Sequence, residues 1–139
     1  MWSRSYSKRV QGLQAEQVWK VWTDLEQWHT WQSDIAYAKL NGEFAVGNTF
    51  LLKPKRGPRV KIQIIKVEPN RQFTDLTRFP GARMYGSHEF VIHGDELEIK
   101  TTISIEGPLA FVWRKFVAED VANGMLEQTE NLIQKVRHA

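Results

Sequence analysis

The last third of the chain carries one long amphipathic pattern, which starts just after Gly107-Pro108 and continues almost to His138. Its apolar residues recur at steps of three and four, as on one face of an α-helix. At 1.5 Å per residue, a helix over residues 109–136 is about 42 Å long, enough to cross the whole face of a curved sheet. Because a curved sheet closed by one helix leaves a cavity, the pattern predicts a container for a hydrophobic ligand. The apolar positions are Leu109, Val112, Trp113, Phe116, Val117, Val121, Met125, Leu132, Ile133 and Val136.

The earlier part of the chain predicts a strand, two short helices and a meander of strands. Residues 2–12 alternate in part and end in glycine, which favours a first strand. Residues 15–25 have one apolar side, which predicts a helix, and a second short helical stretch starts at Glu26 and includes Trp28 and Trp31. Period-two alternation interrupted by turn residues follows and predicts antiparallel neighbours. Six strands are expected at 35–41, 49–55, 59–68, 72–79, 83–93 and 96–106.

The last two predicted strands show which side chains face the interior. In the final strand the apolar face is Leu97, Ile99, Thr101, Ile103 and Ile105, and in the strand before it Met84, Gly86, His88, Phe90 and Ile92. His88 and Thr101 are therefore candidate interior polar groups. Left unpaired in a closed core, such a group costs about 1–3 kcal/mol, whereas in a pocket a ligand or water satisfies it.

Composition bounds the class of protein. A chain of 139 residues predicts a single domain over 1–139, and its six Trp and seven Phe suit both a core and a pocket wall. The lack of cysteine excludes a disulfide scaffold, a thiolate metal site and a Cys nucleophile. No apolar run follows the first charged residues as in a signal peptide, and charges such as Arg114, Lys115 and Glu119 exclude a membrane-spanning helix. We therefore expect a cytoplasmic protein.

Several motifs point to one family. The sequence reads V-W-K-V-W-T-D and W-H-T-W within residues 18–31, S-H-E-F at 87–90, I-E-G-P-L-A at 105–110, W-R-K-F at 113–116 and A-N-G-M-L at 122–126. These stretches resemble the bacterial polyketide cyclase/dehydrase and lipid-transport branch of the START/Bet v 1-like (SRPBCC) superfamily. The resemblance implies an α+β helix-grip fold, in which a curved antiparallel sheet of about seven strands wraps around the C-terminal helix and encloses an internal cavity. It also implies binding or transport of a lipid, a quinone or a polyketide-like aromatic, although the superfold also includes cyclases and hormone receptors.

Inward-facing and mouth positions form the predicted ligand-binding set. Trp28 and Trp31 either gate the mouth or plug the junction of the helices, and Trp113 is expected mainly in the core. Gly124 either permits close packing or a bend, or serves as a hinge. The set comprises Trp28, Trp31, Phe50, Ile62, Phe73, Met84, His88, Phe90, Ile99, Thr101, Ile103, Trp113, Phe116, Val117, Val121 and Gly124.

An acid–base enzyme is the alternative to a binder. A cyclase or dehydratase needs a base for a proton next to a carbonyl and a donor for the enolate oxygen. His88 is the candidate acid or base, with Asp75 or the Tyr85 and Arg83 pair as partners, and Arg78 as a further donor. The four histidines are scattered and no phosphate-binding glycine loop is present, so we expect no metal and no cofactor. Binding is favoured over catalysis, and His88 is interpreted first as a ligand-orienting or structural residue.

One hairpin is basic, with Lys53, Lys55, Arg56, Arg59 and Lys61 around Gly57-Pro58. No aromatic residue interleaves with these charges, so nucleic acid is not expected as a partner. A solvated hairpin tip is favoured, with weak contact to anionic lipid as the alternative. The chain is expected as a monomer or homodimer. A third hypothesis, a regulatory or chaperone-like interaction module, predicts a cavity filled by side chains and aromatic residues exposed on the surface.

Overall fold

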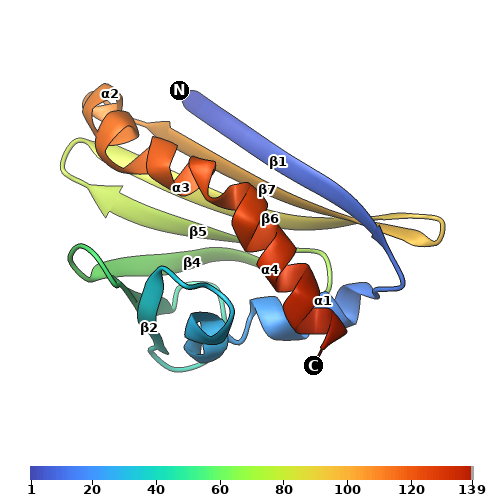
Figure 1. The fold of residues 1–139 in the computed structure, drawn as a ribbon. Coiled ribbons are helices and arrows are strands. Elements are labelled where there is room, and N and C mark those ends of the chain that lie inside the picture. The colour runs from blue at the N-terminus through green and yellow to red at the C-terminus, as the bar shows by residue number, and fades with distance from the viewer. Residues whose placement is uncertain (139) are drawn as a thin grey trace.

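A seven-stranded antiparallel sheet curves around the C-terminal helix (Figure 1). The computed structural model describes residues 1–138. The strand order is β1-β7-β6-β5-β4-β3-β2, so β1 and β2 form the edges. The helix-grip fold predicted from the sequence is confirmed, with every predicted strand present to within one residue at each end. The strands are β1 (Trp2–Gln11), β2 (Ile35–Leu40), β3 (Thr49–Pro54), β4 (Val60–Glu68), β5 (Gln72–Phe79), β6 (Ala82–His93) and β7 (Glu96–Glu106).

Two short helices connect β1 to β2, as expected. Helix α1 (Ala15–Trp22) ends three residues earlier than predicted, where the Thr23 hydroxyl donates to the Trp19 carbonyl at 2.8 Å. The second stretch is the 3-10 helix η1 (Leu25–Thr30). Together they cover one end of the sheet's inner face.

The C-terminal helix is interrupted twice. It consists of α2 (Ala110–Trp113), a π-helical turn η2 (Arg114–Ala118), α3 (Glu119–Asn123) and α4 (Met125–Arg137). A π turn takes up one residue more than a regular α turn. The residues that face the sheet therefore run Trp113, Ala118, Ala122, Met125, with a first step of five.

This extra residue overturns part of the predicted apolar stripe. A regular helix would bring Phe116 and Val121 onto the sheet, but Phe116 is 73% exposed and Val121 is 41% exposed. Alanines occupy the inner positions instead, with Ala118 fully buried and Ala122 nearly so. Small side chains let the start of the helix lie close to the sheet, and the large ones point to solvent.

The predicted strand register is correct at the centre of the sheet. His88 pairs with Phe73 on one side and Thr101 on the other, and both polar residues are buried on the inner face. Ile92 was also placed on that face but is 72% exposed, because it lies near the end of β6, beyond the cover of the helices.

Two apolar clusters fill the space between sheet and helices. The larger, here called the aromatic half, lies under α1, η1 and α4 and includes Trp22, Trp28, Phe50, Phe73 and Phe90. The smaller, the alanine half, lies under α2, η2 and α3 and comprises Ala82, Ile103, Ile105, Ala118, Ala122 and Met125. Within residues 1–138, no helix combines the length and the apolarity needed to cross a membrane.

Candidate functional site

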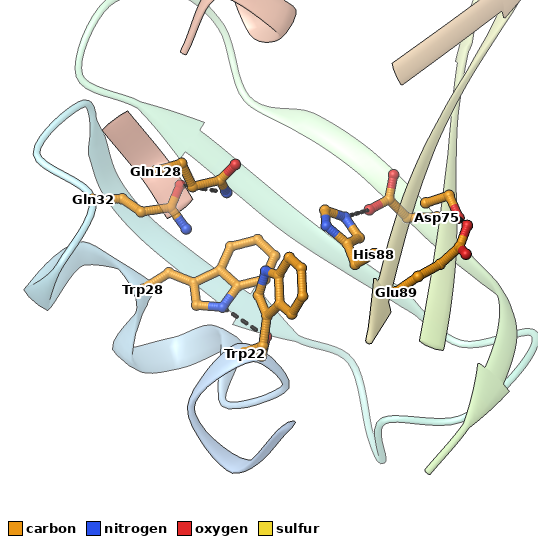
Figure 2. Close-up of polar contacts among 8 residues, drawn as sticks. Trp22, Trp28, Gln32, Asp75, His88, Glu89 and Gln128 are labelled. Atoms are coloured by element: carbon orange, nitrogen blue, oxygen red, sulfur yellow. Dashed lines mark hydrogen bonds and ion pairs between the residues drawn. The ribbon is translucent and has the colours of Figure 1, made fainter. Parts of the chain in front are cut away.

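A histidine–carboxylate pair lies in the interior of the sheet. His88 Nε2 is 3.3 Å from Asp75 Oδ2, and the two residues come from the neighbouring strands β6 and β5 (Figure 2). The imidazole stacks on the Phe73 ring at 4.4 Å between centroids and meets the edge of Trp22 at 4.8 Å. The His88 side chain is therefore held by one polar contact and two aromatic rings.

Gly86 makes room for this pair. It is buried on the inner face of β6, directly opposite Asp75 in the strand register. A Cβ atom at Gly86 would lie 2.8 Å from Asp75 Oδ1, closer than real contacts of this kind. A glycine inside a strand weakens it and marks a place of close approach, which here is the approach of the carboxylate.

Four buried nitrogen atoms have no hydrogen-bond partner among residues 1–138. They are His88 Nδ1, Trp22 Nε1, Trp31 Nε1 and Gln32 Nε2. An unsatisfied buried polar group costs about 1–3 kcal/mol, so four in one small domain need an explanation. Figure 2 shows three of the residues, Gln32, Trp22 and His88, in the region between the sheet and α4.

The unpartnered nitrogens on the neighbouring rings of His88 and Trp22 have opposite hydrogen-bonding character. Asp75 is a carboxylate and accepts, so the proton of a neutral His88 belongs on Nε2, and Nδ1 then presents a lone pair. The indole nitrogen of Trp22 can only donate. The site therefore offers one acceptor and one donor in apolar surroundings.

A second polar contact joins the helices beside these rings. Gln128 Nε2 of α4 donates to Gln32 Oε1 at 3.1 Å, which leaves the amide nitrogen of Gln32 unused (Figure 2). Trp28 lies next to it, and its indole nitrogen donates to the Trp22 carbonyl at 2.9 Å. This buried, hydrogen-bonded Trp28 matches the interpretation as a plug between the helices.

Side chains of residues 1–138 occupy much of the space in which the internal cavity was predicted. Between sheet and helices the interior is occupied by large side chains, among which Trp22, Phe50 and Phe73 are almost completely buried. Two open recesses of about 350 and 410 Å³ lie instead against strands β2–β5 and share Thr49 and Lys61. Phe50 is the one predicted ligand-binding residue that touches either recess. A ligand can enter the interior only if side chains or helices move.

Tyr85, Arg83 and Arg78 are not partners of His88. They lie on the outer face of the sheet, where Tyr85 donates to Glu106 at 2.9 Å, Arg83 pairs with Glu106 at 3.0 Å and Arg78 donates to Gln63 at 2.7 Å. The hydrogen bond to Glu106, reinforced by partial desolvation, raises the pKa of the Tyr85 hydroxyl. The proposed use of the Tyr85 and Arg83 pair with His88 was therefore wrong, because side chains alternate between the faces of a strand.

The helix residues of the predicted ligand-binding set need correction. Phe116 and Val121 point to solvent, and Gly124 is exposed at the break between α3 and α4. A Cβ at Gly124 would make only ordinary contacts, at 3.6 Å or more, so close packing does not explain this glycine. The interruption of the helix there fits the predicted bend. Half-buried are Met84, Trp113 and Val117, and buried are Trp28, Trp31, Phe50, Ile62, Phe73, His88, Phe90, Ile99, Thr101 and Ile103.

Sequence reasoning missed Trp22, Gln32 and Gly86 as site residues. Trp22 was recognised only as part of the apolar side of α1, and the tryptophan's indole nitrogen was a signal that it needs a partner. Gly86 carried the signal of a glycine inside a clear strand. Gln32 carried none. No group of three or more His, Asp or Glu side chains in residues 1–138 is arranged to hold a metal ion.

Comparison with known proteins gives one family. A family model described as "Polyketide cyclase / dehydrase and lipid transport" matches residues 1–137. No curated protein sequence matches the chain.

Many solved structures share the fold at low identity. A START superfamily protein from Mycobacterium smegmatis is 14% identical with a TM-score of 0.76, over 98% of this chain and 97% of that one. A conserved protein from Geobacillus kaustophilus is 14% identical with a TM-score of 0.72, over 99% and 96%. Norcoclaurine synthase from Thalictrum flavum, in complex with dopamine and hydroxybenzaldehyde, is 15% identical with a TM-score of 0.69, over 96% and 86%. These likenesses show the fold alone.

Proposed function

Since the chain belongs to the polyketide cyclase/dehydrase and lipid-transport family, we propose that it binds a small, largely apolar molecule between the sheet and the C-terminal helix. Polar groups of that molecule hydrogen-bond to His88 Nδ1 and Trp22 Nε1. The rest lies against the aromatic half, whose rings offer flat apolar surface.

The unpartnered nitrogens of His88 and Trp22 carry this proposal. They belong to adjacent rings and are buried in apolar surroundings, where one can accept a hydrogen bond from a ligand and the other can donate one. A hydroxyl on a lipid, a reduced quinone or a polyketide-like aromatic fits this description. A ligand that supplies it recovers the free energy that the two unsatisfied groups now cost.

Binding requires the interior to open. One seam at which it can open lies between η1 and α4, where Gln128 donates a hydrogen bond to Gln32. The break at Gly124 permits α4 to change its angle to α3. The filled interior is then the ligand-free state of a container whose rings move aside.

Native mass spectrometry of the purified protein, followed by denaturing extraction, tests the proposal directly. We expect a stoichiometric small molecule with a long or aromatic apolar part and a hydroxyl or carbonyl group. Anilinonaphthalene sulfonate serves as a fluorescent probe of apolar sites, and its binding competes with the extracted molecule.

A pair of matched variants locates the site. Trp22→Phe keeps an aromatic ring but removes the indole donor, and we expect about a fivefold loss of affinity for the extracted molecule. Trp19→Phe makes the same change on the half-buried neighbour in α1, whose indole nitrogen is not among the unpartnered buried atoms, and is expected to lower affinity less. Equal effects of the two variants, or no bound molecule together with no probe binding, would contradict the proposal.

Acid–base catalysis is a second candidate, favoured by the contact between His88 and Asp75. A buried imidazole oriented by a carboxylate is the arrangement that general acid–base catalysis uses. Norcoclaurine synthase, with the same fold, is an enzyme. The extracted molecule is incubated with wild type and with Asp75→Asn, and its conversion is followed by mass spectrometry. Turnover lost in Asp75→Asn with binding retained supports an enzyme, and no conversion by wild type supports a carrier.

A further inference from the structure

The antiparallel meander collects positive charge at one end of the sheet. The β3–β4 hairpin, the β5–β6 hairpin and the β7–α2 connection all lie at this end, together with the N-terminus (Figure 1). We call this the basic end. Its cationic side chains are Lys53, Lys55, Arg56, Arg59 and Lys61 from the first hairpin, Arg78 and Arg83 from the second, and Arg114 and Lys115 from the helix.

Few carboxylates balance these charges. Glu106 pairs with Arg83 at 3.0 Å, and Glu119 with Arg114 at 3.1 Å. Among residues 1–138, none of the five cations of the β3–β4 hairpin forms an ion pair with a carboxylate, and neither does Lys115. The basic end therefore carries a positive field toward solvent.

Large apolar side chains project from the same end. Phe111 is 68% exposed, Phe116 is 73% exposed, and Leu109 is also exposed. They lie on the irregular start of the C-terminal helix, around the exposed cations Arg114 and Lys115. The π turn turns Phe116 away from the sheet and places alanine there, so the sequence presents its bulky residues to solvent at this point.

The projecting segment is anchored from behind. The Trp113 ring stacks on Phe79 of the β5–β6 hairpin at 4.6 Å, and its indole nitrogen donates to the Pro80 carbonyl at 2.8 Å. The Leu109 amide donates to the Gly81 carbonyl at 2.9 Å. Phe111 and Phe116 are thus held outward by a fixed support.

We propose that the basic end docks on an anionic bilayer surface. Leu109, Phe111 and Phe116 enter the boundary between headgroups and acyl chains, while Lys115 and the β3–β4 hairpin bind the anionic headgroups. Exposed phenylalanines flanked by lysine and arginine are the combination that binds such a surface, because apolar burial and charge attraction act together. Charge complementarity favours an anionic bilayer over a neutral one. Docking at this end goes beyond ligand binding and holds whether or not the interior binds a ligand.

Vesicle flotation tests the docking surface. The intact protein is mixed with vesicles of phosphatidylcholine alone, and with vesicles that also contain phosphatidylglycerol. We expect binding to the anionic vesicles only, weakened by salt. Phe111→Ser/Phe116→Ser is expected to lower the partition coefficient at least about tenfold, and Arg56→Glu/Arg59→Glu by about fivefold or more for each charge.

Matched controls come from the opposite end of the molecule. Ile92→Ser removes an apolar residue of similar exposure, and Lys135→Glu/Arg137→Glu reverses two charges at the end of α4. Neither control is expected to change vesicle binding. Thermal unfolding confirms that each variant is folded, as expected for changes outside the core.

Three results would overturn the proposal. Equal binding to neutral and anionic vesicles, or no binding to either, excludes an anionic bilayer as the partner of the basic end. Binding that falls with salt but survives the loss of both phenylalanines identifies a general polyanion site, such as one for nucleic acid. The third result combines no vesicle binding with a homodimer in light scattering that dissociates in Phe111→Ser/Phe116→Ser. It identifies a second copy of the chain as the occupant. None of these results bears on the extraction experiment, so docking and ligand binding fail separately.

Discussion

The aromatic half and the alanine half of the interior use their large side chains in opposite ways. In the aromatic half, rings of Trp19, Trp22, Phe73 and Phe90 meet edge to face or tilted and fill the space under α1 and α4. In the alanine half, small side chains hold the helix close to the sheet, and Phe116 lies outside. A similar set of residue types thus builds a core in one half and a surface in the other. The difference comes from a single π turn, which sets which side of the helix faces inward.

The largest expected effect tests the aromatic half. Trp22→Ala removes the most voluminous fully buried side chain and leaves a cavity among rings that cannot collapse around it. We expect the free energy of unfolding to fall by about 3–5 kcal/mol, measured by urea denaturation. Phe116→Ala, at its exposed position in the other half, is the control and is expected to change stability by less than about 0.5 kcal/mol. Similar losses of unfolding free energy in both variants would contradict the contrast between a buried ring in the aromatic half and an exposed ring in the alanine half.

The next effect tests the close approach in the alanine half. Ala118→Leu inserts extra carbon atoms where the helix contacts β7, and we expect a loss of about 1–3 kcal/mol from overpacking. Ala110→Leu, half-buried in α2, provides a comparison at the same helix. Unchanged stability of the Ala118 variant would mean that the alanine half contains spare space.

A smaller effect tests the boundary between the halves. Gly86→Ala places a methyl group against the Asp75 carboxylate, which must turn away from His88, and we expect a loss of about 1 kcal/mol. In an Asp75→Ala background the same change is expected to cost less, and the double-mutant cycle reports the coupling. Imidazole signals of His88 in NMR should shift in Gly86→Ala. A cycle without coupling would separate Gly86 from the His88 pair.

The smallest effect is a pH dependence on the outside of the sheet. A hydrogen bond from His93 is the main cause that lowers the pKa of the half-buried Glu98 carboxyl below its ordinary value of 4.5. A lowered pKa adds stability that is present above the unfolded value and is lost as the pH falls through the folded one. Wild type should therefore exceed Glu98→Gln in stability at neutral pH, and the difference should shrink below pH 4.5. A difference that is constant with pH would exclude this ionisation as its source.

Strand patterns could be predicted well because alternation has one period and a clear meaning. The run from Leu97 to Ile105 fixed the register, and that register correctly placed His88 and Thr101 inside. The side of the C-terminal helix that faces the sheet could not be predicted in the same way. One extra residue in the π turn moved Phe116 and Val121 out and Ala118 and Ala122 in, and spacing in the sequence does not reveal where such a turn occurs.

The site was predicted in part, for a different reason. His88 and Asp75 were both candidates, and the structure brings them together. The closed interior and the free nitrogen of Gln32 depend on how side chains fill three-dimensional space, and a linear pattern does not contain that information.

The contacts of Trp113 with Phe79 and Pro80 in the β5–β6 hairpin have a mechanical consequence. Any force that lifts the start of the C-terminal helix is transmitted to Phe79, and β5 continues inward from Phe79 through Thr77 and Asp75 to Phe73 on the same face. Asp75 and Phe73 are two of the contacts that hold His88. A strand is stiff along its length, and at about 3.3 Å per residue the distance from Phe79 to Asp75 is about 13 Å. β5 therefore connects two places mechanically: the start of the C-terminal helix, which contacts Phe79, and the buried His88 imidazole, which Asp75 and Phe73 hold in its orientation.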